Sequence, residues 1–142
     1  MCKSEYGAFF IESLWHKRAV GIILRGFEDD FEEISNSINA VTEVIRKGDA
    51  HGTKRSHQDN QIYIAKLFDE NECFDDVLCD LINDLSGVSQ VKQLIASFQP
   101  NEVFFVVNIP LADIYSGFGS GISKEALSLL SEFNCNLAIN YF

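Results

Sequence analysis

The sequence contains little that marks a membrane, secreted or nucleic-acid-binding protein. Its 142 residues include 2 Pro, and 11 Lys plus Arg stand against 21 Asp plus Glu, for a formal net charge of -10. No apolar run approaches the roughly 20 residues that span a bilayer, and the first ten residues lack the basic and apolar segments of a signal peptide. The excess of acid repels phosphate backbones, which bind clustered Lys and Arg. These absences predict a cytoplasmic protein that binds neither membranes nor nucleic acid.

The four cysteines form no pattern typical of a metal site or of a disulfide framework. The sequence has no C-x-x-C pair and no repeated spacing among Cys2, Cys73, Cys79 and Cys135. Without a signal peptide we expect a reducing compartment, in which these residues are free thiols. The sequence therefore predicts no metal and no cofactor.

Motifs of catalysis are also missing. The Gly-rich stretch 116–121 (SGFGSG) has the spacing G-x-G-x-G, which differs from both common phosphate-binding patterns. Neither the G-x-S-x-G nucleophile elbow nor the H-E-x-x-H zinc helix occurs. We therefore predict no catalytic residue, and we interpret 116–121 as a loop that leads into a helix.

Hydrophobic periodicity predicts strands and helices that mix irregularly along one domain. Strands are expected at 19–27, 61–68, 103–109 and 135–142, and helices at 28–41, 74–85, 88–98 and 123–133. The most apolar strand, 103–109, is predicted at the centre of the sheet with both faces covered. In the last strand, Leu137, Ile139 and Tyr141 share one face. The pattern favours a single α+β domain over 1–142, with a mostly antiparallel sheet and helices packed on it.

A long polar segment, 46–60, is predicted to be a loop. It carries four of the eleven basic residues and two of the three histidines. Its acids and histidines form a D-x-H and an H-x-D pair, Asp49 with His51 and His57 with Asp59. Lys54 and Arg55 lie between the two histidines and oppose a bound cation, so a solvated loop is favoured over a zinc site.

A row of carboxylates follows the polar face of a helix predicted over 72–84. Four of them recur at four-residue intervals and a fifth lies on the flank: Glu72, Asp76, Asp80, Asp84 and Asp75. Each like-charged i, i+4 pair costs about 0.2–0.5 kcal/mol on a helix surface, without an evident local gain. The row is either an ordinary solvated face of an acidic protein or a docking surface for a basic partner. One helix does not supply the converging ligands of a magnesium or calcium site.

A second acidic run begins the helix predicted over 28–41. Asp30 and Glu33 have the spacing of a capping box, and acids in a first turn are each favoured by about 0.3–1 kcal/mol through the helix dipole. These acids join the row above as candidate partner-binding residues: Asp29, Asp30, Glu32 and Glu33.

Residues 20–142 resemble a family of small bacterial domains of unknown function. The resemblance lies in Lys47-Gly48-Asp49 before a strand, and in the helix, loop and strand of 127–141 (LSLLSEFNCNLAINY) that ends in Tyr. The family often has Trp in the second strand, where this chain has Tyr63. Domains of this kind are similar to immunity proteins of contact-dependent growth-inhibition and other polymorphic toxin systems. The resemblance implies a cognate toxin C-terminal domain as partner, and it transfers no catalytic role.

Three hypotheses of function follow. The first is a cytoplasmic immunity protein that uses the two acidic runs to bind a basic toxin domain, since a nuclease cleft attracts carboxylates. The second is a small-ligand-binding domain or an enzyme that uses segment 46–60 against segment 116–121. The third is a subunit of a larger assembly, held through the aromatic stretch 6–15.

Overall fold

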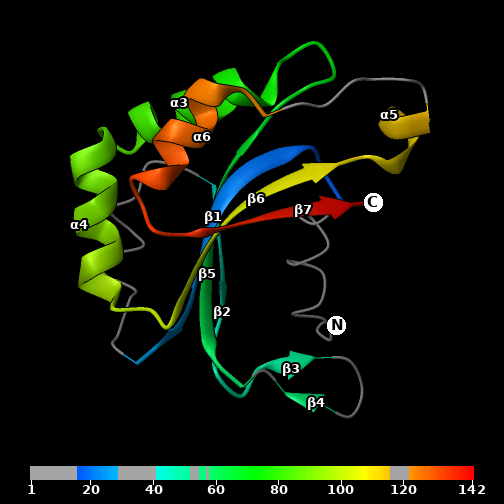
Figure 1. The fold of residues 1–142 in the computed structure, drawn as a ribbon. Helices are drawn as coiled ribbons and strands as arrows, with labels where there is room; N and C mark the ends of the chain where they lie inside the picture. The colour runs from blue at the N-terminus through cyan, green and yellow to red at the C-terminus, as the bar shows by residue number, and fades with distance from the viewer. Residues whose placement is uncertain (1–15, 29–40, 52–54, 57, 116–121) are drawn as a thin grey trace.

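The computed structural model describes residues 16–28, 41–51, 55–56, 58–115 and 122–142. A five-stranded sheet of order β2-β5-β1-β6-β7 organises them (Figure 1). Neighbouring strands are antiparallel except β6 and β7, which are parallel. The strands are β1 (Ala19–Phe27), β2 (Val41–Ile45), β5 (Asn60–Leu67), β6 (Glu102–Ile109) and β7 (Asn136–Tyr141). The predicted α+β class with a mostly antiparallel sheet is confirmed.

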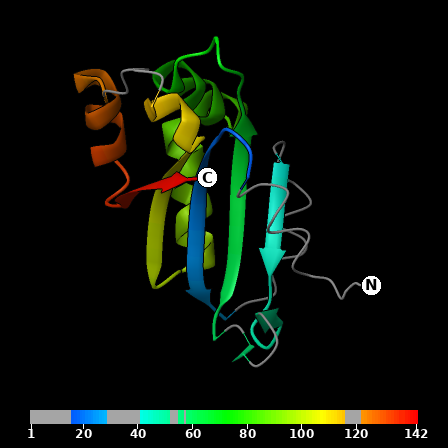
Figure 2. The ribbon, with the colours of Figure 1, turned by 90° about the vertical axis from the view of Figure 1, so that its right-hand side faces the viewer.

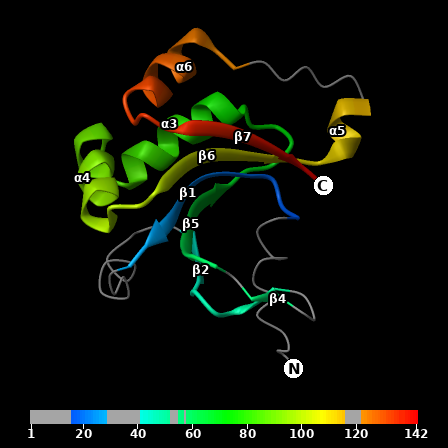
Figure 3. The same cartoon turned by 60° about the horizontal axis from the view of Figure 1, so that its bottom comes forward.

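Three helices pack on one face of the sheet, as Figure 3 shows. They are α3 (Phe74–Asp84), α4 (Val88–Phe98) and α6 (Lys124–Ser131), while the short α5 (Leu111–Tyr115) follows β6. The strands and helices on this face share one large apolar cluster, which includes Ile22, Ile62, Leu81, Val91 and Phe105, all at most 1% exposed. This helix-covered face holds the main core.

The opposite face of the sheet is also buried but has a different composition. Its apolar cluster consists of strand residues, chiefly Ala19, Ile23, Tyr63, Ala65 and Val106. The Tyr63 ring crosses β1 at Gly21, where a Cβ would lie 2.2 Å from Tyr63 Cε1. Tyr63 Oη accepts a hydrogen bond of 3.1 Å from Asn108 Nδ2, so the ring spans three strands.

Several predicted boundaries are confirmed. Strand β1 and helix α4 occupy the predicted ranges, and α6 begins at the predicted cap, where Ser123 Oγ accepts from the backbone N–H of Ala126 at 3.0 Å. These segments agree because their local signals and their packing favour the same conformation.

Four expectations are wrong. Val41, placed at the end of a helix, starts strand β2, which pairs with β5. The central strand is β1 rather than β6, although β6 does pair on both sides (Figure 2). The segment 46–60 is not all loop, because β3 (Ala50–His51) and β4 (Arg55–Ser56) form a small hairpin. The carboxylate row was assigned to a helix over 72–84, but α3 begins at Phe74, where the range 74–85 predicted it.

Among the described residues, no helix has the length and the apolar character needed to cross a membrane.

Candidate protein-binding surface

The exposed side of α3 carries the predicted carboxylate row. Val77, Leu78, Leu81 and Ile82 are buried toward the sheet, which leaves Asp76 and Asp80 exposed on the outer side of the helix. Glu72 is exposed just before the helix. The segment 69–84 holds seven of the 21 acids and no Lys or Arg. We call Glu72, Asp76 and Asp80 the acidic face.

Glu72 belongs to a turn that precedes α3. Its Oε1 accepts from the backbone N–H of Asp69 at 3.1 Å, and its own N–H donates to the carbonyl of Asp69 at 3.2 Å. Glu72 and Asp76 are therefore not an i, i+4 pair inside one helix, and the repulsion expected for them on that basis does not apply. The turn holds the Glu72 backbone in place next to the helix.

Asp84, predicted as a partner-binding residue, already has a partner within the chain. Lys66 of β5 donates from Nζ to Asp84 Oδ2 at 2.7 Å. This hydrogen bond raises the pKa of Lys66, partial burial opposes it, and the charges of Asp84, Asp80 and Glu72 raise the pKa further. A lysine 18 residues away in sequence therefore offsets part of the charge of the row, through a contact that is not local in the chain.

Asp75, predicted as a partner-binding residue, forms a hydrogen bond within the chain. Its side chain is half-buried, and Oδ2 accepts from the backbone N–H of Ser123 at 3.2 Å. Ser123 caps α6, so this carboxylate links the start of α3 to the start of α6. Asp75 holds two helices together and is not part of the acidic face.

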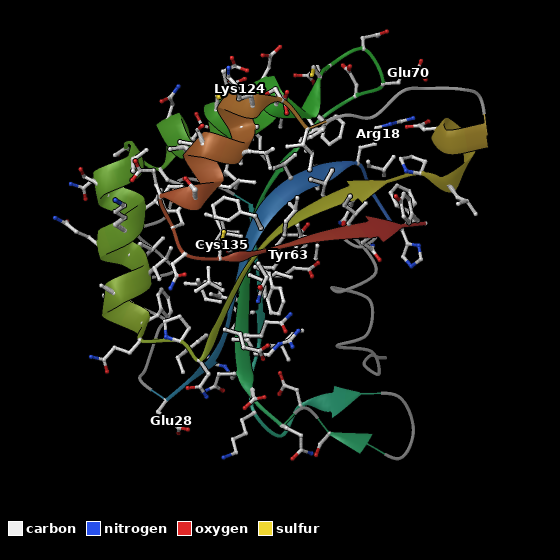
Figure 4. All side chains as sticks on the ribbon, in the orientation of Figure 1. Arg18, Glu28, Tyr63, Glu70, Lys124 and Cys135 are labelled. Carbon is white, nitrogen blue, oxygen red and sulfur yellow. The ribbon has the colours of Figure 1, made fainter. Side chains whose placement is uncertain are left out.

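The second acidic run lies outside the described residues, which applies to Asp29, Asp30, Glu32 and Glu33. Glu28, the residue before them, is exposed at the end of β1. Figure 4 shows Glu28 and Glu70 at opposite ends of the molecule. Glu28 is therefore remote from the start of the segment 69–84.

A shallow hollow of about 320 Å³ lies at the Ala19 end of the sheet, where no motif of the sequence predicted a site. Its lining consists of His16, Lys17, Arg18, Leu67, Phe68, Pro110 and Phe142. Arg18 forms a two-pronged ion pair with Asp113, with Nε–Oδ2 of 3.1 Å and Nη2–Oδ1 of 2.8 Å. The hydrogen bond with Asp113 raises the pKa of Arg18, against partial burial. The basic run 16–18 was the only sequence signal of this hollow.

The two segments of the small-ligand hypothesis have anchors at opposite ends of the sheet. The β3–β4 hairpin precedes β5 at the end where Gln61 pairs with Arg25, whereas α5 follows β6 at the end where Asn108 pairs with Ala19. Six residues of β1 separate these ends, about 20 Å. Residues 52–54, 57 and 116–121 are outside the described part of the chain. The described anchors do not converge on one site.

The thiols differ in their surroundings. Cys73 and Cys79 are exposed, whereas Cys135 is half-buried and its Sγ lies 3.7 Å from the carbonyl oxygen of Leu130. Burial raises the pKa of Cys135. Within the described ranges no three His, Cys, Asp or Glu side chains are grouped so as to hold a metal ion.

Comparison of the chain with protein-family models, with curated proteins and with solved structures finds no match.

Proposed function

We propose that this chain is a cytoplasmic immunity protein that binds a cognate, basic toxin domain and neutralises it. The observation that carries the proposal is the acidic face, in which Asp76 and Asp80 are exposed on the outer side of α3 and Glu72 is exposed just before it. The seven acids of 69–84 are accompanied by no basic residue in that segment. Such a concentration of one sign of charge steers an oppositely charged partner and raises its association rate about 10- to 1,000-fold.

Contacts with the rest of the fold hold α3, which carries most of the acidic face, in a fixed position, as an inhibitor requires. Four side chains of α3 are buried against the sheet, Asp75 ties the helix to α6, and Lys66 ties its end to β5. A surface held in this way loses little conformational freedom when a partner binds, so more of the contact energy appears as affinity. A toxin that cleaves nucleic acid binds phosphates with Lys and Arg. Carboxylates of an inhibitor at matching positions bind these Lys and Arg in place of the phosphates.

The proposal gives the acids of the predicted row unequal roles. Asp76 and Asp80 are exposed in the middle of α3 and are the primary contacts, with Glu72 beside them. Asp84 is shielded by Lys66, and Asp75 acts inside the fold. Asp29, Asp30, Glu32 and Glu33 remain a proposed second contact region.

A pair of matched charge-reversal variants tests this proposal. The first is Asp76→Lys with Asp80→Lys. The control is Asp59→Lys with Glu102→Lys, because both residues are exposed near the opposite end of the sheet. Each variant replaces two acids by two lysines, so net charge changes equally. Tagged wild-type chain and both variants are used to capture partners from the native bacterium.

The expected result is one protein fragment that the wild type and the control retain and the α3 variant loses. Produced alone, this fragment arrests growth. Growth returns when the wild type or the control is co-produced, and it does not return with the α3 variant. Equal protection by both variants would contradict the acidic face as the binding surface. Failure of the wild-type chain to retain any growth-arresting partner would contradict the immunity function itself.

A further inference from the structure

The edge strand β7 exposes a row of apolar side chains. Leu137, Ile139 and Tyr141 are 38%, 47% and 49% exposed. They pair in register with Phe105, Val107 and Ile109 of β6, which places them on the helix-covered face of the sheet. In Figure 1 β7 lies at the near edge of the sheet, next to β6. Among the described strands, β6 is the neighbour of β7, and no other described strand pairs with its outer side.

The two edges of the sheet differ in charge. Edge strand β2 carries the buried carboxylate of Glu43, and the exposed Arg46, Lys47 and Asp49 follow within four residues of its end. The segment 133–142 (FNCNLAINYF), which includes β7, has no charged side chain and no proline. Charges and prolines are the usual means of preventing edge-to-edge pairing, and β7 has neither.

We propose that β7 is a self-association surface on which a second copy of this chain adds its own β7. The two strands run antiparallel about a two-fold axis through Ile139 and join the sheets into one of ten strands, five from each copy. In this register Ile139 faces its counterpart and Leu137 faces Tyr141 of the second copy. Directly opposite residues of an antiparallel pair point to the same face, so the three apolar side chains of each copy form one continuous row.

The charge distribution favours β7, rather than another part of the surface, as the place where a second copy binds. Two chains of net charge -10 repel each other over most of their surfaces. The electrostatic repulsion is smallest where charged side chains are absent, as they are along β7. A basic partner is attracted instead to the acidic face on α3. That helix packs on β1 and β5, which are inner strands of the sheet and are separated from β7 by β6. Self-association therefore leaves the acidic face open, and the inference does not depend on the proposed function.

Sedimentation of the full chain over a range of concentrations tests the proposal. The wild-type mass is expected to rise from one protomer toward two as concentration increases. Ile139→Lys places a charge at the two-fold axis and is expected to hold the mass at one protomer. Leu127→Lys is the matched control, because Leu127 is an equally exposed leucine on α6. It is expected to associate as the wild type does. Thermal unfolding verifies that both variants fold.

Disulfide trapping tests the register. In a chain whose native cysteines are replaced by serine, Ile139→Cys is expected to form a covalent dimer on mild oxidation, because facing residues lie about 4.5–5.5 Å apart between Cα atoms, within disulfide range. Asn136→Cys is the control, since the two copies of residue 136 would lie about 20 Å apart. A wild-type chain of one protomer at every concentration would overturn the proposal, as would equal trapping of the two cysteine variants.

Discussion

The two faces of the sheet are buried by opposite means. The helix-covered face is filled with bulky side chains, such as Ile22, Leu81 and Phe105, that meet three helices. The other face combines Ile23 and Val106 with the small residues Ala19, Gly21 and Ala65, and the Tyr63 ring lies across β1 at Gly21. Bulky side chains stabilise the first face. The second face requires that residue 21 has no side chain, because the Tyr63 ring occupies that space.

This difference shows why the two faces tolerate change differently. An apolar core loses stability when atoms are removed, because the transfer energy is lost and a cavity remains. A face on which an aromatic ring crosses a glycine loses stability when atoms are added, because the ring or the strand must move.

The largest loss is expected from removing volume on the helix-covered face. Leu81 is fully buried in α3, so Leu81→Ala is expected to lower the free energy of unfolding by about 2–5 kcal/mol. Leu127→Ala is the control, because that leucine is 51% exposed, and a change within about 0.5 kcal/mol is expected there. Urea unfolding followed by fluorescence measures both. Equal losses would contradict the placement of the core.

Adding one methyl group should damage the other face. The Cβ of Gly21→Ala would meet Tyr63 Cε1 at 2.2 Å and the carbonyl oxygen of Ile64 at 2.7 Å. A loss of about 1–3 kcal/mol is expected from this overpacking. In the double variant with Tyr63→Leu, the ring atoms are gone and part of the loss should be recovered, with a coupling energy of about 0.5–3 kcal/mol. Strict additivity would show that the ring does not cross Gly21.

The polar contact of Tyr63 should have a smaller effect that depends on pH. Tyr63→Phe removes the hydrogen bond from Asn108 and is expected to cost about 0.5–1.5 kcal/mol at pH 7. Burial, followed by the charge of Glu43, raises the pKa of Tyr63 above its ordinary 10.0, with the Asn108 bond opposing.

The sign of this pH effect follows from linkage. The folded chain keeps the Tyr63 phenol neutral while the unfolded chain ionises it near pH 10.0, so the stabilisation is complete below that pH and is lost as pH rises above it. Wild type should therefore lose stability faster than Tyr63→Phe above pH 10, which unfolding curves from pH 7 to 11 measure. Parallel curves would show that Tyr63 titrates as an exposed phenol.

The smallest effect is expected at the rim of the helix-covered face. Asp84→Asn removes the ion pair with Lys66, which is partly exposed to solvent, so a loss of only about 0–1 kcal/mol is expected. The pKa of Lys66 is raised in the folded chain, so this contribution is present below pH 10.5 and is lost above it. Added salt should shrink the difference from wild type at pH 7. A salt-independent loss above 2 kcal/mol would place the pair in the core.

Sequence patterns predicted some elements to the residue and misplaced others. Strand β1 and helix α4 were predicted with their observed bounds, because each combines a strong apolar pattern with clear ends. Val41 was assigned to a helix from its spacing to earlier apolar residues, yet it forms β2 by pairing with Ala65. The strand 103–109 looked central because it is so apolar, but sheet order depends on which strands meet, and β1 lies between β5 and β6.

The candidate surface was predicted in part. The spacing of Asp76 and Asp80 identified an exposed acidic row, since helical periodicity alone places residues four apart on one side. It did not identify the partner of Asp84 or the burial of Asp75, because Lys66 and Ser123 reach these carboxylates through the tertiary fold. The exposed row on β7 was predicted as one face of a strand, but its position at the sheet edge was not.

The amino-acid sequence by itself determined the charge of this protein, the outer side of α3 and the alternation along β7, because these follow from composition and from the periods of helix and strand. Only the tertiary structure decided that β7 is an edge, that Tyr63 lies over Gly21 and that Lys66 meets Asp84. Those features depend on contacts between residues far apart in the chain, and local periodicity carries no information about which distant segments become neighbours.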